Sequence, residues 1–214
     1  MKVSLSWLRE WVEVTLDQQA LASKLTLAGF EVESCEPAAP AFEGVVVAQV
    51  LEAVPHPQAT KLRVCRVDAG AAQPLQVVCG AANVRAGLRV ALAQVGAALP
   101  GGVNIGNAAL RGVQSQGMLC SAKELGLAAT SEGLLELPDD APVGTDLRRY
   151  LDLDDAVLEV SIYPNRGDAM SVRGLSREVS ALLAQPAHPP NWPAVPVTTE
   201  AVHPLQVLAP DAAP

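Results

Sequence analysis

Near the N-terminus, apolar residues recur at the three- and four-residue spacing of an amphipathic helix. These positions are Trp7, Leu8, Trp11 and Val12. Asp17 can cap a second helix, and Gly29 suits the left-handed position after it. The buried stripe of this second helix is expected to hold Leu21, Leu25 and Ala28. A short strand is predicted next, at residues 30–32, before a boundary marked by prolines.

The middle of the chain has a different pattern, in which short β-branched runs alternate with turn signals. Three of these runs predict strands, at residues 45–51, 62–67 and 75–79. A small helix is expected at residues 121–124, because Ser121 and Glu124 have the spacing of a capping box. Many short strands with one small helix are typical of a closed barrel or a sandwich.

The pattern of the first residues returns after residue 148. A strand is predicted at residues 157–162, and Asp168 can cap a helix that buries Val172, Leu175, Val179 and Leu182. Neither terminal block has enough apolar surface to fold well alone. We therefore expect residues 1–38 and 149–186 to form one split α+β domain, interrupted by a β module at residues 39–148. The proline-crowded residues 187–214 are interpreted as a linker and the start of a following domain.

Charge is unevenly distributed along the chain. Half of the 214 residues are apolar and 18% are charged, which excludes a disordered polyelectrolyte. The net charge of −8 argues against general nucleic-acid binding. Residues 61–123, however, carry a net charge of +6, which indicates a local RNA-binding surface. The alternative is a solvated face whose charges keep strand edges soluble.

The four cysteines give no sign of a disulfide or a metal site. They are Cys35, Cys65, Cys79 and Cys120. No two form a C-x-x-C pair, and no histidine lies at ligand spacing from them, so we expect reduced, structural thiols.

The charged, tryptophan-containing start is unlike a signal peptide, and no apolar run reaches the roughly 18 residues of a membrane span. These features predict a cytoplasmic protein without membrane association.

Several stretches of the chain resemble one known family. In order and spacing, residues 54–64, 78–87 and 110–127 resemble the EMAP-II-like tRNA-binding OB domain. The flanking residues 6–12, 27–33 and 164–168 resemble those around this domain in bacterial phenylalanyl-tRNA synthetase beta subunits. The chain departs from the family in Gln58, Thr60 and Ala169, where Asn, Asp and Cys are usual. The resemblance implies an α+β multidomain fold, with a β-barrel OB-fold inserted into a small split α+β domain.

The same resemblance implies an accessory, tRNA-binding role without a catalytic site in this segment. The intact subunit would pair with an alpha subunit that joins phenylalanine to its tRNA using ATP and Mg²⁺, in an assembly of two alpha and two beta subunits. No cofactor is expected in this segment, and the editing site of the family would lie beyond residue 214. A free-standing EMAP-II-like tRNA-binding protein and a purely structural module without RNA affinity are the alternatives.

Eight residues of the β module are candidate RNA contacts. They are Lys61, Arg63, Asn83, Arg85, Arg111, Ser115, Met118 and Lys123. Lys61 and Arg63 lie two positions apart on one predicted strand, so they share a face suited to adjacent phosphates. The resemblance places the loop containing Ser115 and Met118 at the RNA-facing rim, although Met118 would also suit the packing of a barrel mouth. His56 is interpreted first as a turn histidine with local hydrogen bonds, and second as an RNA or metal contact.

The residues 165–168 invite a catalytic interpretation, which we reject. An Asp that opens a helix is first of all a cap, and Arg166 is well placed to pair with Asp168 or a neighbouring carboxylate. The chain has no phosphate-cradling Gly-rich loop, no nucleophile elbow and no carboxylate pair placed to hold Mg²⁺. The sequence therefore predicts no chemistry for this segment.

Overall fold

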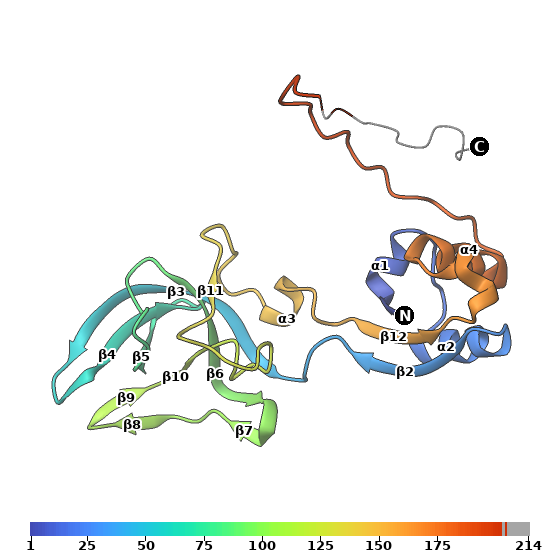
Figure 1. The fold of residues 1–214 in the computed structure, drawn as a ribbon. Coiled ribbons are helices and arrows are strands. Elements are labelled where there is room, and N and C mark those ends of the chain that lie inside the picture. The colour runs from blue at the N-terminus through green and yellow to red at the C-terminus, as the bar shows by residue number, and fades with distance from the viewer. Residues whose placement is uncertain (203, 205–214) are drawn as a thin grey trace.

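A computed structural model describes residues 1–202 and 204. It is mixed α and β with mostly sheet, and its elements gather in two groups (Figure 1). We call the group formed by the two ends of the chain the terminal lobe, and the group formed by its middle the central module. Among the described residues, no helix combines the length and the apolar character that a membrane crossing requires.

The terminal lobe is built on a sheet to which both ends of the chain contribute. Its three antiparallel strands lie in the order β1 (Lys2–Ser4), β12 (Ala156–Ser161) and β2 (Glu31–Pro37). Its helices are α1 (Leu5–Arg9), α2 (Gln18–Leu27), the 3-10 helix η2 (Pro164–Ala169) and α4 (Val172–Leu183). One hydrophobic core joins all of these elements, with Leu158 of the central strand opposite Val3 and Cys35.

The helix ends confirm some of the predicted caps and correct one. Asp17 accepts from the backbone N–H of Ala20 at the start of α2, and Gly29 after this helix has φ +92°. Leu21 and Leu25 are buried, whereas Ala28 is exposed at the helix end. The cap of α4 is Ser171 and not Asp168. Asp168 lies too early for that position, in η2, where it pairs with Arg166 as predicted.

The central module is an antiparallel sheet that curls around its core (Figure 1). The main strands lie in the order β10 (Gly117–Cys120), β6 (Arg89–Leu99), β3 (Glu43–His56), β4 (Ala59–Asp68) and β5 (Leu75–Cys79). β7 (Val103–Asn104), which follows the 3-10 helix η1 (Pro100–Gly102), and β11 (Glu136–Leu137) pair with β6. β8 (Ala108–Leu110) and β9 (Val113–Ser115) form a separate hairpin.

The ends of this sheet meet without a continuous ladder. The backbone N–H of Gln116 donates to the carbonyl of Gln76 in β5 at 2.8 Å. The side chain of Gln76 in turn donates to the carbonyl of Gln114 at 2.8 Å. Because no strand ladder joins β5 to β10 in the described residues, the sheet is open, and the predicted closed barrel is not formed by continuous pairing. The expected helix at residues 121–124 is a turn, although Ser121 and Glu124 make the reciprocal capping-box hydrogen bonds.

Burial sets the pKa of the cysteine thiols in the central module. Cys65, Cys79 and Cys120 are buried, Cys35 is partly buried, and all four cysteines are free. Burial raises the pKa of Cys65 to about 11 and that of Cys120 to about 12, so these thiols stay protonated near neutral pH. In the described part of the chain, no group of His, Cys, Asp or Glu side chains is arranged to hold a metal ion.

Arg148 holds together the two chain segments that connect the lobe and the module. It lies at the start of α3 (Leu147–Tyr150), and its guanidinium donates to the carbonyl of Pro40 at 2.6 Å. The same group pairs with Asp154 at 2.8 Å and stacks over the ring of Phe42. Arg148 therefore couples the segment entering the module to the segment leaving it.

After α4 the chain passes back over the terminal lobe. Ala187 bridges to Val12, and Trp192 packs edge-on against Trp11 with ring centroids 5.4 Å apart. Residues 188–202 contain no helix or strand. The predicted start of a following domain lies partly at residues 203 and 205–214, outside the described residues.

Candidate nucleic-acid interface

Two of the candidate RNA contacts lie on the long β3–β4 hairpin. His56 pairs with Ala59 across the two-residue turn of Pro57 and Gln58. Lys61 and Arg63 follow in β4, and both side chains are exposed. Because they lie two residues apart on one strand, they point to the same face, as the sequence predicted. The hairpin therefore presents two adjacent cations.

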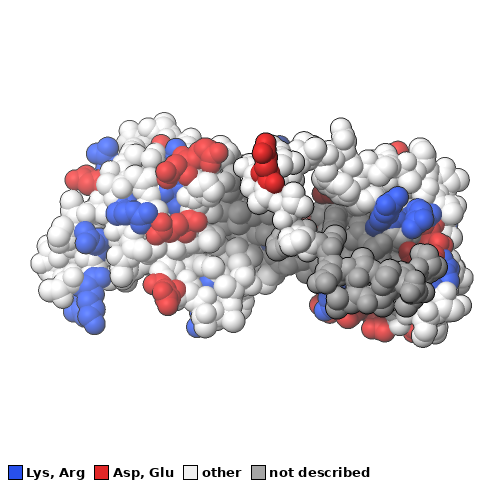
Figure 2. Space-filling view, turned by 45° about the horizontal axis from the view of Figure 1, so that its top comes forward, with Lys and Arg blue, Asp and Glu red and all other residues white. Residues whose placement is uncertain are grey.

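A third candidate lies at the tip of the neighbouring β8–β9 hairpin. Leu110 pairs with Val113, so Arg111 and Gly112 form the two-residue turn, with φ values of 46° and 82°. Two successive positive φ values are typical of a type I′ turn. Arg111 is exposed and lines one groove of about 740 Å³ together with residues 56–62 of the β3–β4 hairpin. In Figure 2, several Lys and Arg side chains lie over the end of the module that carries these hairpins.

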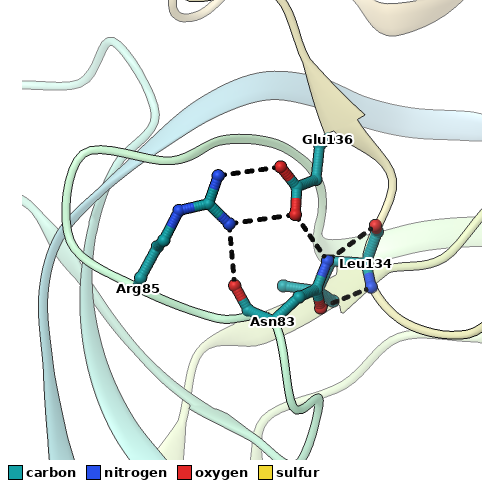
Figure 3. A network of polar contacts seen from close by, with 4 residues as sticks. All are labelled: Asn83, Arg85, Leu134 and Glu136. Atoms are coloured by element: carbon teal, nitrogen blue, oxygen red, sulfur yellow. Dashed lines mark hydrogen bonds and ion pairs between the residues drawn. The ribbon is translucent and has the colours of Figure 1, made fainter.

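Asn83 and Arg85 instead take part in a polar network within the protein (Figure 3). The guanidinium of Arg85 donates two hydrogen bonds of 2.9 Å to the carboxylate of Glu136. Asn83 donates to Glu136 at 3.0 Å and exchanges two hydrogen bonds with the backbone of Leu134. The network ties the loop before β6 to β11, so the charge of Arg85 is already paired.

This network gives the stability of the module a defined pH dependence. Hydrogen bonds from Arg85 and Asn83 lower the pKa of Glu136 from 4.5 to about 2. Because the pKa is lowered on folding, the stabilisation is fully present above about pH 4.5 and is lost as the pH falls towards 2. We expect the stability difference between the wild type and Arg85→Ala to shrink over this interval. Denaturant unfolding at a series of pH values measures this difference, and an NMR titration that finds Glu136 near 4.5 in the wild type would contradict it.

The remaining candidates differ in exposure. Ser115 is only 2% exposed, and its hydroxyl accepts from the backbone of Val78 and donates to the carbonyl of Gly117. Met118 is half-buried and packs against the core, which agrees with its alternative interpretation. Lys123 is exposed in the turn after β10. The structure thus places Lys61, Arg63 and Arg111 on neighbouring hairpins, whereas Ser115 is buried and bonds to the protein backbone.

The positive sequence window is not one continuous surface. Arg66 is exposed but lies on the opposite face of β4 from Lys61 and Arg63, and Arg89 is half-buried at the start of β6.

Two features were not predicted from the sequence, the hydrogen bonds of Gln76 that join the sheet ends and the contact of His56 with the β8–β9 hairpin. Neither has a local sequence signal, because each pairs residues about 40 or more positions apart.

Comparisons with known proteins also point to the central module. Residues 45–146 match the family model described as "Putative tRNA binding domain". All 214 residues match phenylalanine–tRNA ligase beta subunits of Methylococcus capsulatus and Pseudomonas fluorescens at 52% identity. A match to the subunit of Bordetella parapertussis has 53% identity over 211 residues. The chain spans about a quarter of the length of these relatives, 27%, 27% and 26%.

Two solved structures match part of this chain. The C-terminal domain of Plasmodium vivax p43 is 22% identical and covers 47% of this chain and 56% of its own, with a TM-score of 0.35. A MetRS related protein from Pyrococcus horikoshii is 27% identical and covers 47% of this chain and 84% of its own, also with a TM-score of 0.35. Scores of this size do not establish a shared fold. The sequence comparisons confirm the resemblance: the whole chain is similar to phenylalanine–tRNA ligase beta subunits, and residues 45–146 of its central module match a tRNA-binding domain model.

Proposed function

We propose that this chain is the N-terminal, tRNA-contacting part of a phenylalanine–tRNA ligase beta subunit. Its role is accessory, and the reaction itself takes place elsewhere in the enzyme. The observation that carries this proposal is the 52% identity to beta subunits over all 214 residues. The match of residues 45–146 to a tRNA-binding domain model supports an RNA contact by the central module.

In the whole enzyme, the proposed partners are tRNA and the alpha subunit. The complete cytoplasmic assembly, with two alpha and two beta subunits, would join phenylalanine to its tRNA using ATP and Mg²⁺. A full-length beta subunit is then expected to co-purify with the alpha subunit, and the complex to aminoacylate tRNA. A beta chain that stays alone on co-expression would contradict this part of the proposal.

We further propose that residues 39–148 form an OB-fold inserted into a split domain of residues 1–38 and 149–186. The strand order β10-β6-β3-β4-β5 supports the OB topology, because the hydrogen bonds of Gln76 bring β5 back towards β10. The split domain is supported by the sheet and core shared between the two ends of the chain. Residues 187–214 would be the linker to a following domain.

The side chains of the module favour contacts with the RNA backbone over contacts with bases. No Phe, Tyr or Trp occurs between Phe42 and Tyr150, so the module has no aromatic platform for base stacking. Lys61, Arg63 and Arg111 are exposed cations on neighbouring hairpins, which suits phosphates. Met118 and Lys123 remain candidate contacts. Asn83, Arg85 and Ser115 would act mainly by holding the shape of the module.

A salt titration of tRNA binding by the 214-residue chain tests the RNA contact. Each phosphate contact that is lost lowers affinity about tenfold at 0.1 M salt and reduces the salt slope by about one. We therefore expect Lys61→Glu with Arg63→Glu to lower affinity by about 100-fold and to flatten the slope by about two. Fluorescence anisotropy of labelled tRNA at several salt concentrations gives both quantities.

Arg173→Glu is the matched control. Arg173 is exposed on α4 of the terminal lobe, so its reversal lowers the net charge by two units, as each single hairpin reversal does, without touching the hairpins. It is expected to leave the affinity within about twofold, because exposed charges beyond a Debye length are screened. If the wild-type chain binds no tRNA even at low salt, a purely structural module is the better account.

A further inference from the structure

The β8–β9 hairpin carries Arg111 but is not part of the main sheet. Among the described residues, β8 and β9 form a ladder only with each other. Near its base, the hairpin is tied to β5 by Ser115 and by the hydrogen bonds of Gln76. At its tip, the carbonyl of Leu110 is hydrogen-bonded to the side chain of His56, which belongs to β3. The position of Arg111 relative to the β3–β4 hairpin therefore depends on this histidine.

The hydrogen bonds of His56 fix its tautomer. Nδ1 accepts from the backbone N–H of Gln58 at 3.1 Å, so this nitrogen carries no proton. Nε2 then carries the proton and donates to the carbonyl of Leu110 at 3.1 Å. His56 is only 5% exposed, so it is in a poor position to touch RNA itself. One nitrogen thus shapes the turn of the β3–β4 hairpin, and the other holds the neighbouring hairpin.

The backbone of Arg111 is a second, independent observation. Its φ of 46° lies in the left-handed region, which is unfavourable for an L-residue other than Gly, Asn or Asp. Asn or Gly is the usual residue at this turn position. Strained backbone tends to persist where a side chain is needed for function. Here the side chain lines a groove with Lys61 from the other hairpin.

We infer that His56 is a positioning residue of the RNA surface, which holds Arg111 at the groove it shares with Lys61. This inference rests on the proposed function and adds to it the means by which two hairpins become one phosphate-binding groove. His56 acts through its hydrogen bond to the carbonyl of Leu110. The phosphate contacts themselves come from Lys61 and Arg111.

A double-mutant cycle on tRNA binding tests the inference. In His56→Asn, the shorter side chain can still accept from Gln58 but cannot reach Leu110, so the tie between hairpins is broken and the turn is kept. We expect His56→Asn and Arg111→Ala each to lower affinity, by up to about tenfold at 0.1 M salt. Because both act on one contact, adding His56→Asn to Arg111→Ala should change affinity by less than about twofold.

Lys61→Ala and His56→Gln are the matched controls. Lys61 makes its contact independently of the tie, so the losses from His56→Asn and Lys61→Ala should multiply. His56→Gln keeps a donor near the position of Nε2 and should retain more affinity than His56→Asn. Circular dichroism melts show whether each variant is folded, and amide exchange at the β8–β9 tip, measured without RNA, should accelerate in His56→Asn but not in Lys61→Ala.

The outcomes separate this inference from the proposed function. If the wild type binds tRNA and Arg111→Ala weakens binding while His56→Asn does not, the inference is overturned and the proposed function stands. Multiplying losses in the His56 and Arg111 cycle would show that His56 acts on RNA by another route, which also overturns it. Absence of binding by the wild type overturns the proposed function, and the inference with it.

Discussion

Replacing Leu158 by alanine is expected to lower the free energy of unfolding of the terminal lobe by about 2–5 kcal/mol. Leu158 is fully buried in β12, the central strand of the sheet that joins both ends of the chain. Its side chain lies between elements from residues 1–37 and from residues 156–183. Removing most of it leaves a cavity where these two parts of the sequence meet, so their association weakens.

Tryptophan fluorescence during denaturant unfolding measures this change selectively. Trp7, Trp11 and Trp192 all lie outside the central module, which has no aromatic residue between Phe42 and Tyr150. The matched control is Leu27→Ala, because Leu27 is 89% exposed in the same lobe and should cost less than about 0.5 kcal/mol. Equal effects of the two variants would contradict a core shared between the chain ends.

Gly174→Ala is expected to destabilise the same lobe by about 2–3 kcal/mol. Gly174 lies in α4, where a Cβ would collide with the carbonyl oxygen of Asp168 and would lie 2.9 Å from the Cα of Ala169. Both contacts are with backbone, which cannot rotate away, so helix α4 or η2 has to shift. The higher helix propensity of alanine, worth about 1 kcal/mol in an open helix, offsets only part of this cost.

Gly167→Ala provides the comparison within the same segment. Gly167 is exposed in η2, and a Cβ there would meet nothing within 4 Å. Its substitution is expected to change the free energy of unfolding by less than about 0.5 kcal/mol. If thermal melts show Gly174→Ala to be as stable as Gly167→Ala, the close approach of α4 to η2 is wrong.

Much of the fold could be predicted because its signals are local. The run of residues 75–79 predicted β5, and the cap at Asp17 predicted the start of α2, since strand alternation and capping depend on neighbouring residues. Asp168 shows the limit of such signals. Ser171 is an equally good cap three residues later, and the packing of α4 against η2 decides between them.

The candidate site was harder to predict, because its assembly depends on contacts between distant residues. The sequence named Lys61, Arg63 and Arg111 as candidate RNA contacts from charge and spacing. It could not show that Glu136 already pairs with Arg85, since 51 positions separate them. The tie between His56 and Leu110 likewise spans 54 positions and involves a backbone carbonyl, which no residue type reveals.

An NMR titration of the isotope-labelled chain with tRNA at low salt locates the RNA-binding surface residue by residue. We expect amide shifts to change at residues 56–63 and 110–112, on the two hairpins, and to stay unchanged in the terminal lobe. Added salt should reverse these changes as binding is lost. Changes confined to the terminal lobe, or binding that leaves both hairpins unperturbed, would contradict an RNA surface on these hairpins.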